Sequence, residues 1–600
     1  MQRLSYLVPV VCGPPATICQ PVGLKHKDLP AKSAILRELL KGISKPETMK
    51  RVRRLLELLW IATLGIALIV SALSTDRRAR QVEENPSFCD PFGYLQMADD
   101  IRRAAASRTA PQFVIETPHT RLLVELMQSQ KQPVPLWDEM VAPLAFHYFP
   151  AADHVAAQYP PGAGLLLSLF PEGRALHGLN RMVVVIFLMA GLGMLVVAAI
   201  KRRPIAASFL VLALILGLEI VAQLDNASFS MNSLLAPLLL SGLCLSAAWA
   251  LGSDNSKRFY LAWLLTLLAG LFLGFAILAR IPVVLLLPGV FLLLWPVSLR
   301  TLHKSPWIPF GLGVFLGGIL PLMIHQSRVA GAWYLTTYAH ENTEPPTLDR
   351  VMDNISYYYG PGRSSSVNWG ITALFIGLVG LLLWSQRRVG IGAPAKFLRR
   401  VSWTRLIASA AVVLAVSNVY FLTHVARVHY YTWPAMFGAV LMLALGAFAL
   451  ENNPAATTQS TGWLRRSLML FGLFLALAPA VVVMGRVWSH YEPPSGETPR
   501  KQFSIPAELA DESAWVWACQ LSGTFWYYGR KPTHKVTSTN AEIRELVFKF
   551  VQRRGEPQFI VNDDPSMQAV LDEIVQLGGK LEPRGAVDNY PYYLIHWAPK

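Results

Sequence analysis

Long apolar runs, each about twenty residues in length and nearly free of charge, recur along most of the chain. A helix needs about 20 apolar residues to cross the hydrocarbon core of a bilayer. The pattern therefore predicts eleven membrane-spanning helices. They cover approximately residues 55–74, 182–200, 205–222, 233–251, 259–279, 281–298, 308–325, 369–385, 406–423, 432–450 and 467–485.

A further apolar stretch, residues 161–170 (PGAGLLLSLF), is too short to span a membrane alone and runs into Glu172 and Arg174. Two interpretations stay open for it, a short span or a re-entrant helix that dips into the membrane and returns.

Lysine and arginine are unequally distributed between alternate loops, and this bias sets orientation. With the N-terminus inside and 161–170 not crossing, the inner loops together hold 15 Lys and Arg and the short outer loops hold 5. Both large hydrophilic segments, 75–160 and 486–600, then face outward. Arg77, Arg78 and Arg80, just outside the first span, are the exception to this bias.

Composition narrows the class of protein further. Of 600 residues, 53% are hydrophobic and 15% are charged, whereas soluble domains carry about 25% charged residues. The mean hydropathy is +0.37. The net charge of +16 then indicates basic loops beside a membrane rather than a nucleic-acid partner. A single water-soluble enzyme is excluded.

Three parts follow from these patterns. Residues 1–54 form a basic, cytoplasmic, partly disordered segment, in which Met49 opens MKRVRRLLELLW and reads as an alternative start. Residues 55–485 form an all-α polytopic membrane domain, with about 11 transmembrane helices and one more that is short or re-entrant. Residues 486–600 form a small α/β extramembrane domain.

The pattern of the C-terminal part alternates between helix and strand. Helices are predicted in AEIRELVFKFVQRRG and PSMQAVLDEIVQLGG, and strands in SGTFWYYGR, QFIVNDD and PYYLIHW.

The first outer loop carries the clearest candidate chemistry, in SFCDPFGYLQMADDIRRAA. Apolar positions from Pro91 onward recur at helical spacing, which predicts an amphipathic helix on the membrane surface. Such a helix would hold Asp90 at the boundary of water and lipid, where a carboxylate can act as a base. Asp90 can equally cap that helix, with Pro91 at its first position.

Cations at the outer ends of spans form a second candidate set: Arg280, Arg328 and Arg427, with His424 and His429 beside the last. Arginines near aromatic residues suit a lipid phosphate, but side chains at helix ends also commonly anchor a helix in the interface. The sequence QYPPG at 158–162 predicts a rigid turn into the membrane. No nucleotide-binding or zinc motif is present, so the energy for any reaction must come with the substrate.

The order of these parts resembles the GT-C superfamily of membrane glycosyltransferases, which includes the aminoarabinose transferase and protein O-mannosyltransferase families. The resemblance rests on one span followed by an early aspartate with a tyrosine (Asp90, Tyr94), an A-D-D-I-R helix and a YPPG element (Tyr159 to Gly162). An R-x-x-Y-Y…P element at Arg427 and a soluble outer C-terminal part complete it. It covers most of residues 50–600.

The resemblance implies inverting transfer of a sugar from a polyprenyl-phosphate donor to an envelope acceptor on the outer face of the membrane. Asp90 would be the general base. The donor phosphate or sugar would be bound by Arg280, Arg328, Arg427, His429, Tyr94 and Tyr159. Many relatives carry a paired acidic motif near the first span, whereas Asp90 is followed by Pro91. A second carboxylate, where one is needed, would come from Asp99, Asp100, Asp138 or Glu139.

The expected partners are the donor, membrane lipid and a glycan, lipid or protein acceptor, without nucleic acid. No cofactor is required by the residues, and a role for a divalent metal cation is left open. The expected location is a bacterial inner membrane with the C-terminal domain in the periplasm. Cys89 and Cys519 would both lie outside, where a disulfide could join them.

Two other classes of function remain open. An O-antigen ligase or polymerase also consumes polyprenyl-linked sugars, but would rely on Arg427, His424 or His429 rather than Asp90. A secondary transporter would place ionisable residues in mid-membrane and show repeated halves. Neither feature is evident in this chain, and a purely structural scaffold gives no reason for polar groups on one face.

Overall fold

A computed structural model of the chain describes most of the segments discussed above. The described residues are 46–79, 89–130, 137–222, 229–251, 256–295, 306–337, 346–360, 372, 376, 403–424, 431–450, 505–531 and 533–598. The chain forms two compact units, Met1–Leu59 and Trp60–Lys600. The first contributes the beginning of helix α2 (Pro46–Ala79), and the second contains everything that follows.

The apolar runs form the longest helices. These are α7 (Ala175–Lys201), α8 (Pro204–Ala222), α9 (Phe229–Leu251), α10 (Ser256–Ala279), α17 (Trp403–Thr423) and α18 (Trp433–Leu450). Two further runs are composite. One joins a 3-10 turn, η1 (Ile281–Leu286), to α11 (Leu287–Leu294), and the other joins α12 (Trp307–Val314), a π-helical turn (Phe315–Ile319) and α13 (Leu320–Val329).

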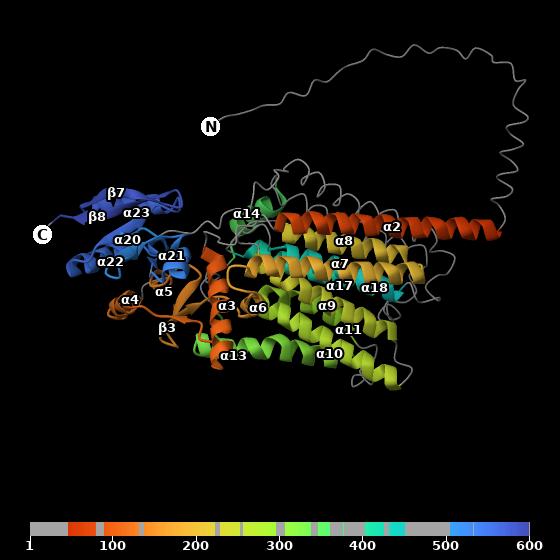
Figure 1. Cartoon of the computed structure of the whole chain (residues 1–600). Helices are drawn as coiled ribbons and strands as arrows, with labels where there is room; N and C mark the ends of the chain where they lie inside the picture. Colours follow the sequence, from red (N-terminus) through yellow and green to blue (C-terminus); the bar gives the residue numbers. More distant parts are fainter. Residues whose placement is uncertain are drawn as a thin grey trace, which may run out of the picture. The chain divides into compact units, whose positions relative to one another are not determined.

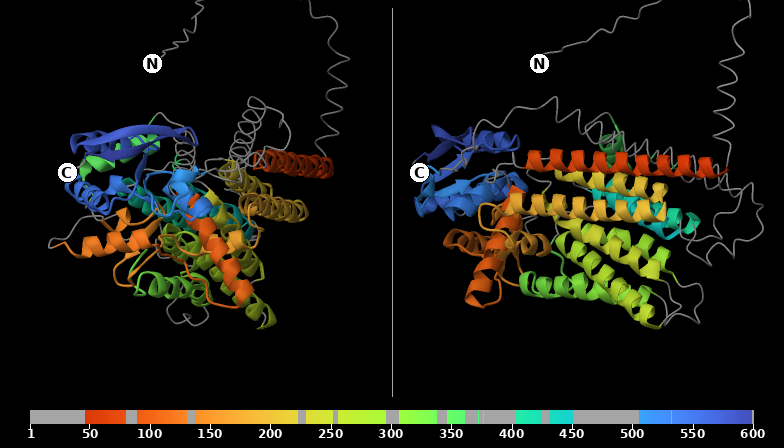
Figure 2. Two further views of the ribbon diagram at one scale, coloured as in Figure 1. Left: turned by 60° about the vertical axis from the view of Figure 1, so that its left-hand side comes forward. Right: turned by 45° about the vertical axis from the view of Figure 1, so that its right-hand side comes forward.

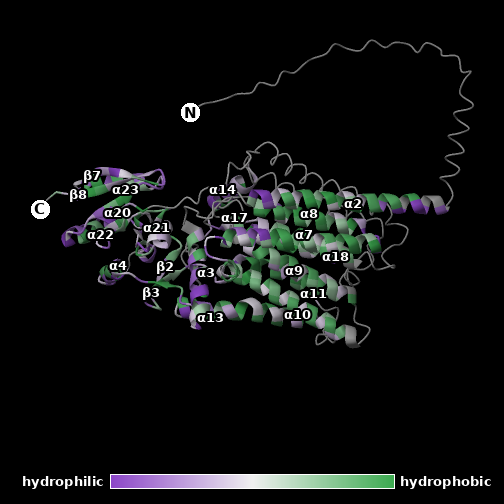
Figure 3. Cartoon of the chain, in the orientation of Figure 1, coloured by the Kyte–Doolittle hydropathy of each residue, from purple (hydrophilic) through white to green (hydrophobic). Residues whose placement is uncertain are grey.

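The long helices of the second unit pack alongside one another (Figures 1 and 2). Helix α8 lies against α7 and α18, and α10 lies against α9 and α12. At the centre, the rings of Phe187 and Phe437 stack with centroids 5.7 Å apart. Hydrophobic residues cover these helices almost completely, as Figure 3 shows. Their backbone groups are paired within each helix, which is what an apolar solvent requires.

The predicted spans are found as helices wherever the structure describes them. Among the described residues, seven helices are long and apolar enough to cross a membrane, and Ile281–Leu294 and Trp433–Gly446 form shorter apolar helices. The predicted spans 369–385 and 467–485 lie outside the described residues, apart from two isolated positions. The protein is therefore a polytopic membrane protein, and the count of eleven stays a prediction.

The stretch predicted as a short or re-entrant span forms the seven-residue helix α6 (Gly162–Ser168). At 1.5 Å per residue it is far too short to cross a bilayer. It packs instead against α3 (Cys89–Ser107) and against α7, α9 and α10.

The segment between α3 and α6 contains elements that the sequence pattern did not predict. Helices α4 (Pro118–Gln128) and α5 (Trp137–Met140) accompany three short strands, β1 (Val114–Ile115), β2 (Phe146–Phe149) and β3 (His154–Ala157). The strands form an antiparallel sheet in the order β1-β3-β2, in which His147 lies opposite Ala156. Helix α14 (Leu348–Tyr359) lies later in the chain, between α13 and α17.

The C-terminal part contains a five-stranded mixed sheet in the order β5-β4-β6-β8-β7. Its strands are β4 (Trp515–Trp517), β5 (Thr533–His534), β6 (Gln558–Val561), β7 (Gly579–Val587) and β8 (Tyr590–Trp597). Its helices are α20 (Ala507–Ala510), α21 (Ser522–Gly529), the 3-10 turn η6 (Val536–Ser538), α22 (Ala541–Arg554) and α23 (Met567–Gln576). Strand β4 is parallel to β5 and β6, and β8 is antiparallel to β6 and β7.

The predicted alternation is present in α22, β6, α23 and β8, but one assignment is wrong. SGTFWYYGR forms helix α21 rather than a strand. Aromatic residues favour strands in general, yet here the buried Phe525 and Trp526 pack inward while Tyr527 and Tyr528 contact Phe92 of α3. Tertiary packing outweighs the local preference for a strand.

Candidate functional site

Helix α3 carries the predicted base in its first turn. Asp90 is the second residue of α3, but its side chain lies outside the described residues. From Pro91 to Asp100 every residue of the helix is buried. The expected amphipathic helix on the membrane surface is therefore corrected: the helix exists, but its first half is enclosed by protein, because α6 and α21 cover it.

Two glycines of the YPPG region join α3 to the end of α10. A Cβ atom on Gly164 would lie 2.8 Å from Cβ of Met97, and one on Gly162 would lie 2.4 Å from the backbone nitrogen of Ala279. Only glycine permits such close approach of α6 to both neighbours. Since Arg280 follows Ala279 directly, the same contact ties α3 to the arginine predicted to bind phosphate.

The two tyrosines predicted to bind the substrate lie against each other. The rings of Tyr94 and Tyr159 stack with centroids 4.2 Å apart and an interplanar angle of 15°, and both side chains are buried. The Nε2 amide of Gln158 donates to the hydroxyl of Tyr159 at 3.0 Å. The pair therefore forms a joint between α3 and the turn that leads into α6.

Arg280 lines a cavity of about 310 Å³ at the point where α10, η1, α17 and α18 come together. Its guanidinium lies over the ring of Tyr431, 5.0 Å from the centroid, a cation–π geometry. The buried His424 shares the cavity and lies close to the rings of Tyr420 and Tyr431. Apart from a few polar groups, the walls are apolar side chains. The cavity thus combines a fixed cation with an apolar lining.

Three residues lining this cavity were not singled out by the sequence: Thr336, Ser417 and Tyr420. Ser417 and Tyr420 lie three positions apart on α17, which places them on one face of that helix. The spacing of Ser417, Tyr420 and His424 places all three on one helix face. Nothing in the sequence, however, showed that α17 ends beside Arg280.

Besides Arg280 and His424, the other candidate cations are not placed in this cavity by the described residues. Arg328, near the end of α13, lines a separate hollow with Ile101, Phe113 and His325. Arg427 and His429 lie outside the described residues. Of the five candidate cations, the described part of the chain therefore places Arg280 and His424 in the cavity and Arg328 outside it.

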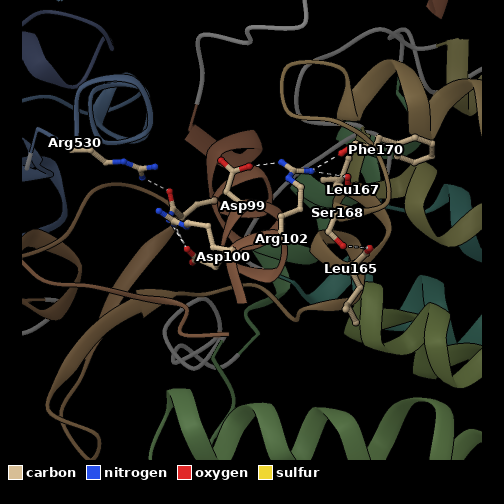
Figure 4. Close-up of polar contacts among 10 residues, drawn as sticks. Asp99, Asp100, Arg102, Leu165, Leu167, Ser168, Phe170 and Arg530 are labelled. Atoms are coloured by element: carbon tan, nitrogen blue, oxygen red, sulfur yellow. Dashed lines mark hydrogen bonds and ion pairs between the residues drawn. The ribbon is translucent and has the colours of Figure 1, made fainter. Parts of the chain in front are cut away.

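The two carboxylates in the middle of α3 belong to a polar cluster (Figure 4). Asp99 pairs with Arg102, and Asp100 pairs with Arg103. Arg102 also donates to the carbonyls of Leu167 at 3.2 Å and Phe170 at 2.7 Å. These carbonyls lie at the end of α6, where helix carbonyls lack partners within the helix. Asp99 therefore holds Arg102 in place, and Arg102 in turn hydrogen-bonds the end of α6 to α3.

Asp100 is buried and connects α3 to the C-terminal part. It accepts a bond of 2.9 Å from Gln96, and Gln96 in turn accepts one from Arg530. Burial raises the pKa of Asp100 to about 6, although the bonds from Arg103 and Gln96 oppose the rise. Tyr527 hydrogen-bonds to Asp99, and burial together with this carboxylate raises its pKa. The sequence pattern did not indicate Arg530 and Tyr527 as contacts of α3, because SGTFWYYGR has the aromatic composition of a strand but forms helix α21.

Asp138 and Glu139, the other candidate carboxylates, lie on α5. Asp138 is buried. Glu139 pairs with Lys535 at 3.2 Å, so it contacts the C-terminal part. Asp99 and Asp100 lie about 13–15 Å along the helix axis from Asp90, at 1.5 Å per residue. Neither is a neighbour of Asp90 on α3.

Two further expectations concern metal and disulfide chemistry. Within the described ranges, no group of three or more His, Cys, Asp or Glu side chains is arranged to hold a metal ion. Cys519 is a free, buried cysteine whose Sγ lies 3.6 Å from Oγ1 of Thr537. The structure therefore contains no bond from Cys519 to Cys89, whose side chain lies outside the described residues.

No protein-family model matches the chain, and no curated protein sequence matches it. Among solved structures, the chain is similar to ArnT from Cupriavidus metallidurans in the apo state, with 12% identity and a TM-score of 0.47 over 90% of this chain and 98% of that one. It is also similar to the same protein bound to undecaprenyl phosphate, with 14% identity and a TM-score of 0.45 over 90% and 99% of the chains. A third similarity is to the oligosaccharyltransferase of Archaeoglobus fulgidus tethered with an acceptor peptide, with 11% identity and a TM-score of 0.36 over 89% and 74% of the chains.

Proposed function

We propose that this protein is an integral membrane glycosyltransferase of the GT-C type. It transfers a sugar from a polyprenyl-phosphate donor to an envelope acceptor on the outer face of the membrane, with inversion at the anomeric carbon. The membrane is a bacterial inner membrane, and the C-terminal part lies in the periplasm.

The Arg280 cavity is the observation that carries this proposal. A polyprenyl phosphate needs an apolar wall for its chain and a cation for its phosphate, and the cavity offers both in one place. The leaving group of the reaction is a phosphate, whose negative charge grows as the bond to the sugar breaks. A preorganised cation stabilises that charge most where water is excluded. Arg280, held against Tyr431, supplies such a cation.

Asp90 is the proposed general base. An acceptor hydroxyl has a high pKa and attacks the anomeric carbon effectively only when a base takes its proton. Asp90 is the second residue of α3, which is buried from Pro91 to Asp100 and braced by α6 against the end of α10. This bracing fixes the start of α3 relative to Arg280. Because the leaving phosphate is already an anion, no general acid is required.

The remaining candidates take supporting roles in this proposal. Tyr94 and Tyr159 are positioning residues, because their stacked rings join α3 to α6. Arg427 and His429 stay proposed ligands of the donor, together with Arg280.

One observation favours a second candidate function. His424 is buried in the same cavity as Arg280, and a ligase or polymerase of polyprenyl-linked glycans would use arginine and histidine there instead of Asp90. In that case the donor carries a diphosphate. No observation among the described residues favours the transporter.

The test uses the full chain in lipid nanodiscs with a panel of polyprenyl-phosphate sugars. Donor consumption is followed for the wild type, for Asp90→Asn and for Asp349→Asn. Asp349 lies in the first turn of α14 and is exposed, so it controls for the loss of a carboxylate at a helix start. We expect Asp90→Asn to lose about 10²–10⁴-fold in rate, the usual contribution of a general base.

A folded Asp90→Asn variant that consumes donor at the wild-type rate would show that Asp90 is not the general base. Consumption of diphosphate-linked donors alone, with loss of activity in His424→Gln, would favour the ligase instead.

A further inference from the structure

Helix α14 exposes a continuous apolar stripe. Leu348, Met352 and Ile355 are 76%, 57% and 38% exposed, and their spacing of four and then three residues places them on one face of the helix. Single exposed apolar side chains are common on protein surfaces. Three of them along one face of a helix of 12 residues form a surface that needs a partner. These three residues are called the α14 stripe below.

The other faces of α14 are of two kinds. On one side of the stripe, the side chains of Asn354 and Tyr358 are buried against the protein. On the other side lie the exposed Asp349 and Asp353, each one position after a residue of the stripe and so turned from it by about 100°. The stripe therefore lies between a face packed on protein and a polar face. A helix that lies on a membrane beside a membrane protein has this pattern, because it meets protein, lipid and water.

Asn354 attaches α14 to the end of α17, which is one of the candidate membrane spans. Its Nδ2 amide donates to the carbonyl oxygens of Leu422 and His424, both at 2.9 Å. Carbonyls at the end of a helix lack partners within the helix, so Asn354 supplies donors that α17 needs. Helix α17 ends at Thr423, and an apolar span ends where the hydrocarbon ends. Helix α14 is therefore held at the level of the lipid headgroups.

A second contact with α17 gives the direction in which the stripe points. Tyr359 lies four residues after Ile355, on the same face as the stripe, and its hydroxyl donates to Oδ1 of Asn418 at 2.7 Å. Asn418 lies about 7.5 Å before Thr423 along the axis of α17, at 1.5 Å per residue. From the end of the span, that direction leads towards the middle of the membrane. The face of α14 that carries the stripe is therefore turned towards the hydrocarbon.

We propose that α14 is an interfacial helix whose stripe inserts among the acyl chains of the leaflet that surrounds the end of α17. Val419, the residue after Asn418, is exposed on α17 and meets lipid at the same depth. Asp349 and Asp353 stay in water on the other side of α14. Acyl chains are common to membrane phospholipids, so this contact selects no headgroup. The proposal concerns the partner of α14 and does not depend on the proposed sugar transfer.

The experiment locates the stripe with two quenchers that occupy different phases. The full chain in nanodiscs carries a bimane label on one introduced cysteine, and emission from the native cysteines, measured with the wild-type chain, is subtracted. Phosphatidylcholine brominated on its acyl chains quenches a label in hydrocarbon, whereas iodide quenches a label in water. Met352→Cys should lose emission in the brominated lipid and keep it in iodide. Asp353→Cys, its neighbour on the polar face, should do the reverse.

A second matched pair decides if one variant fails to fold. Ile355→Cys should follow Met352→Cys, and Ser356→Cys should follow Asp353→Cys; all four positions are exposed. Met189→Cys, at an exposed position of α7, gives the response of a span to the brominated lipid. Quenching of the stripe labels by iodide would overturn the proposal, because the stripe would lie in water. Quenching by neither agent would also overturn it, because another part of the chain or a second copy would cover the stripe.

Discussion

The ring of Tyr94 lies flat on the ring of Tyr159, with centroids 4.2 Å apart, although the two residues come from different elements of the chain. Tyr94 belongs to α3 and Tyr159 precedes α6. A Cβ atom on Gly93 would lie 2.7 Å from the ring of Tyr159, so the two backbones are as close as the ring allows. This contact holds α3, whose second residue is Asp90, against the turn that leads into α6, and α6 in turn contacts Ala279 next to Arg280.

Loss of the Tyr159 ring should weaken the packing of α3 against the turn before α6. Removing a buried aromatic side chain costs about 3–5 kcal/mol, so Tyr159→Ala should lower the unfolding temperature and reduce sugar transfer by misplacing α3. Tyr159→Phe retains the stack and loses the bond from Gln158, which costs about 1 kcal/mol, so it should stay close to the wild type. Thermal unfolding and donor consumption measure the two effects. A Tyr159→Phe variant as inactive as Tyr159→Ala would show that the hydroxyl, not the ring, is required.

Arg280 should matter for the transition state rather than for folding. Removing one group that stabilises developing charge costs about 10²–10³ in rate, so Arg280→Gln should lower kcat/KM for the donor by that factor. Arg280→Lys keeps the charge but loses the planar contact with Tyr431, and an intermediate value is expected. Arg174→Gln, which removes an exposed arginine at the start of α7, controls for the removal of a positive charge. Unchanged kcat/KM in Arg280→Gln would remove Arg280 from the donor site.

Much of the membrane part could be predicted because hydrophobicity alone decides it. A run such as α8, buried along nearly its whole length, has no alternative to a helix in an apolar solvent. The elements of the first outer loop were missed for the opposite reason. Strands β2 and β3 are four residues long, and their pairing depends on contacts that local pattern does not contain. Strand β7 is exposed over much of its length, so it lacks the alternation that marks a half-buried strand.

Single residues of the candidate site could be predicted from the sequence, but which of them lie together could not. Arg280 was identified because a cation after a long apolar run is conspicuous. Arg328 looked equivalent by the same criterion, yet it lines a different hollow, because helix ends on one side of a bundle need not converge. Asp100 is predicted only as a possible second carboxylate on a helix at the membrane surface, whereas the structure buries it; the helical period gives the direction of a side chain but not what is packed against it.

The burial of Asp100 should make stability depend on pH. Its pKa in the folded protein is raised to about 6 from an ordinary value of 3.8, so the folded state holds the proton more tightly than the unfolded state. Stability should therefore fall as the pH rises from about 4 to about 6, by about 3 kcal/mol for this group. Asp100→Asn removes the titration, and its apparent unfolding temperature should decline less over that range.

Two comparisons keep this test specific. Burial also raises the pKa of Asp563 to about 6, so Asp100→Asn flattens only part of the profile. Asp153→Asn should leave the range from pH 4 to 6 unchanged, since the bonds from Arg121 and Tyr148 lower the pKa of Asp153 to about 2. A wild-type slope in Asp100→Asn would mean that Asp100 is not the group that titrates.

The contact between Arg530 and Gln96 should couple α21 to α3. Arg530 follows α21 and donates to the buried side chain of Gln96, beside the contacts of Phe92 with Tyr527 and Tyr528. A double-mutant cycle of Arg530→Met and Gln96→Met isolates this bond from the aromatic packing. Because Arg530 is largely exposed, we expect a coupling energy of only about 1 kcal/mol. Unfolding temperatures converted to free energies measure the coupling.

Arg553→Met with Gln96→Met is the control, since Arg553 lies in the last turn of α22 and has no bond to Gln96 in the described residues. Strict additivity in the Arg530 cycle would mean that α21 is held on α3 by the aromatic rings alone.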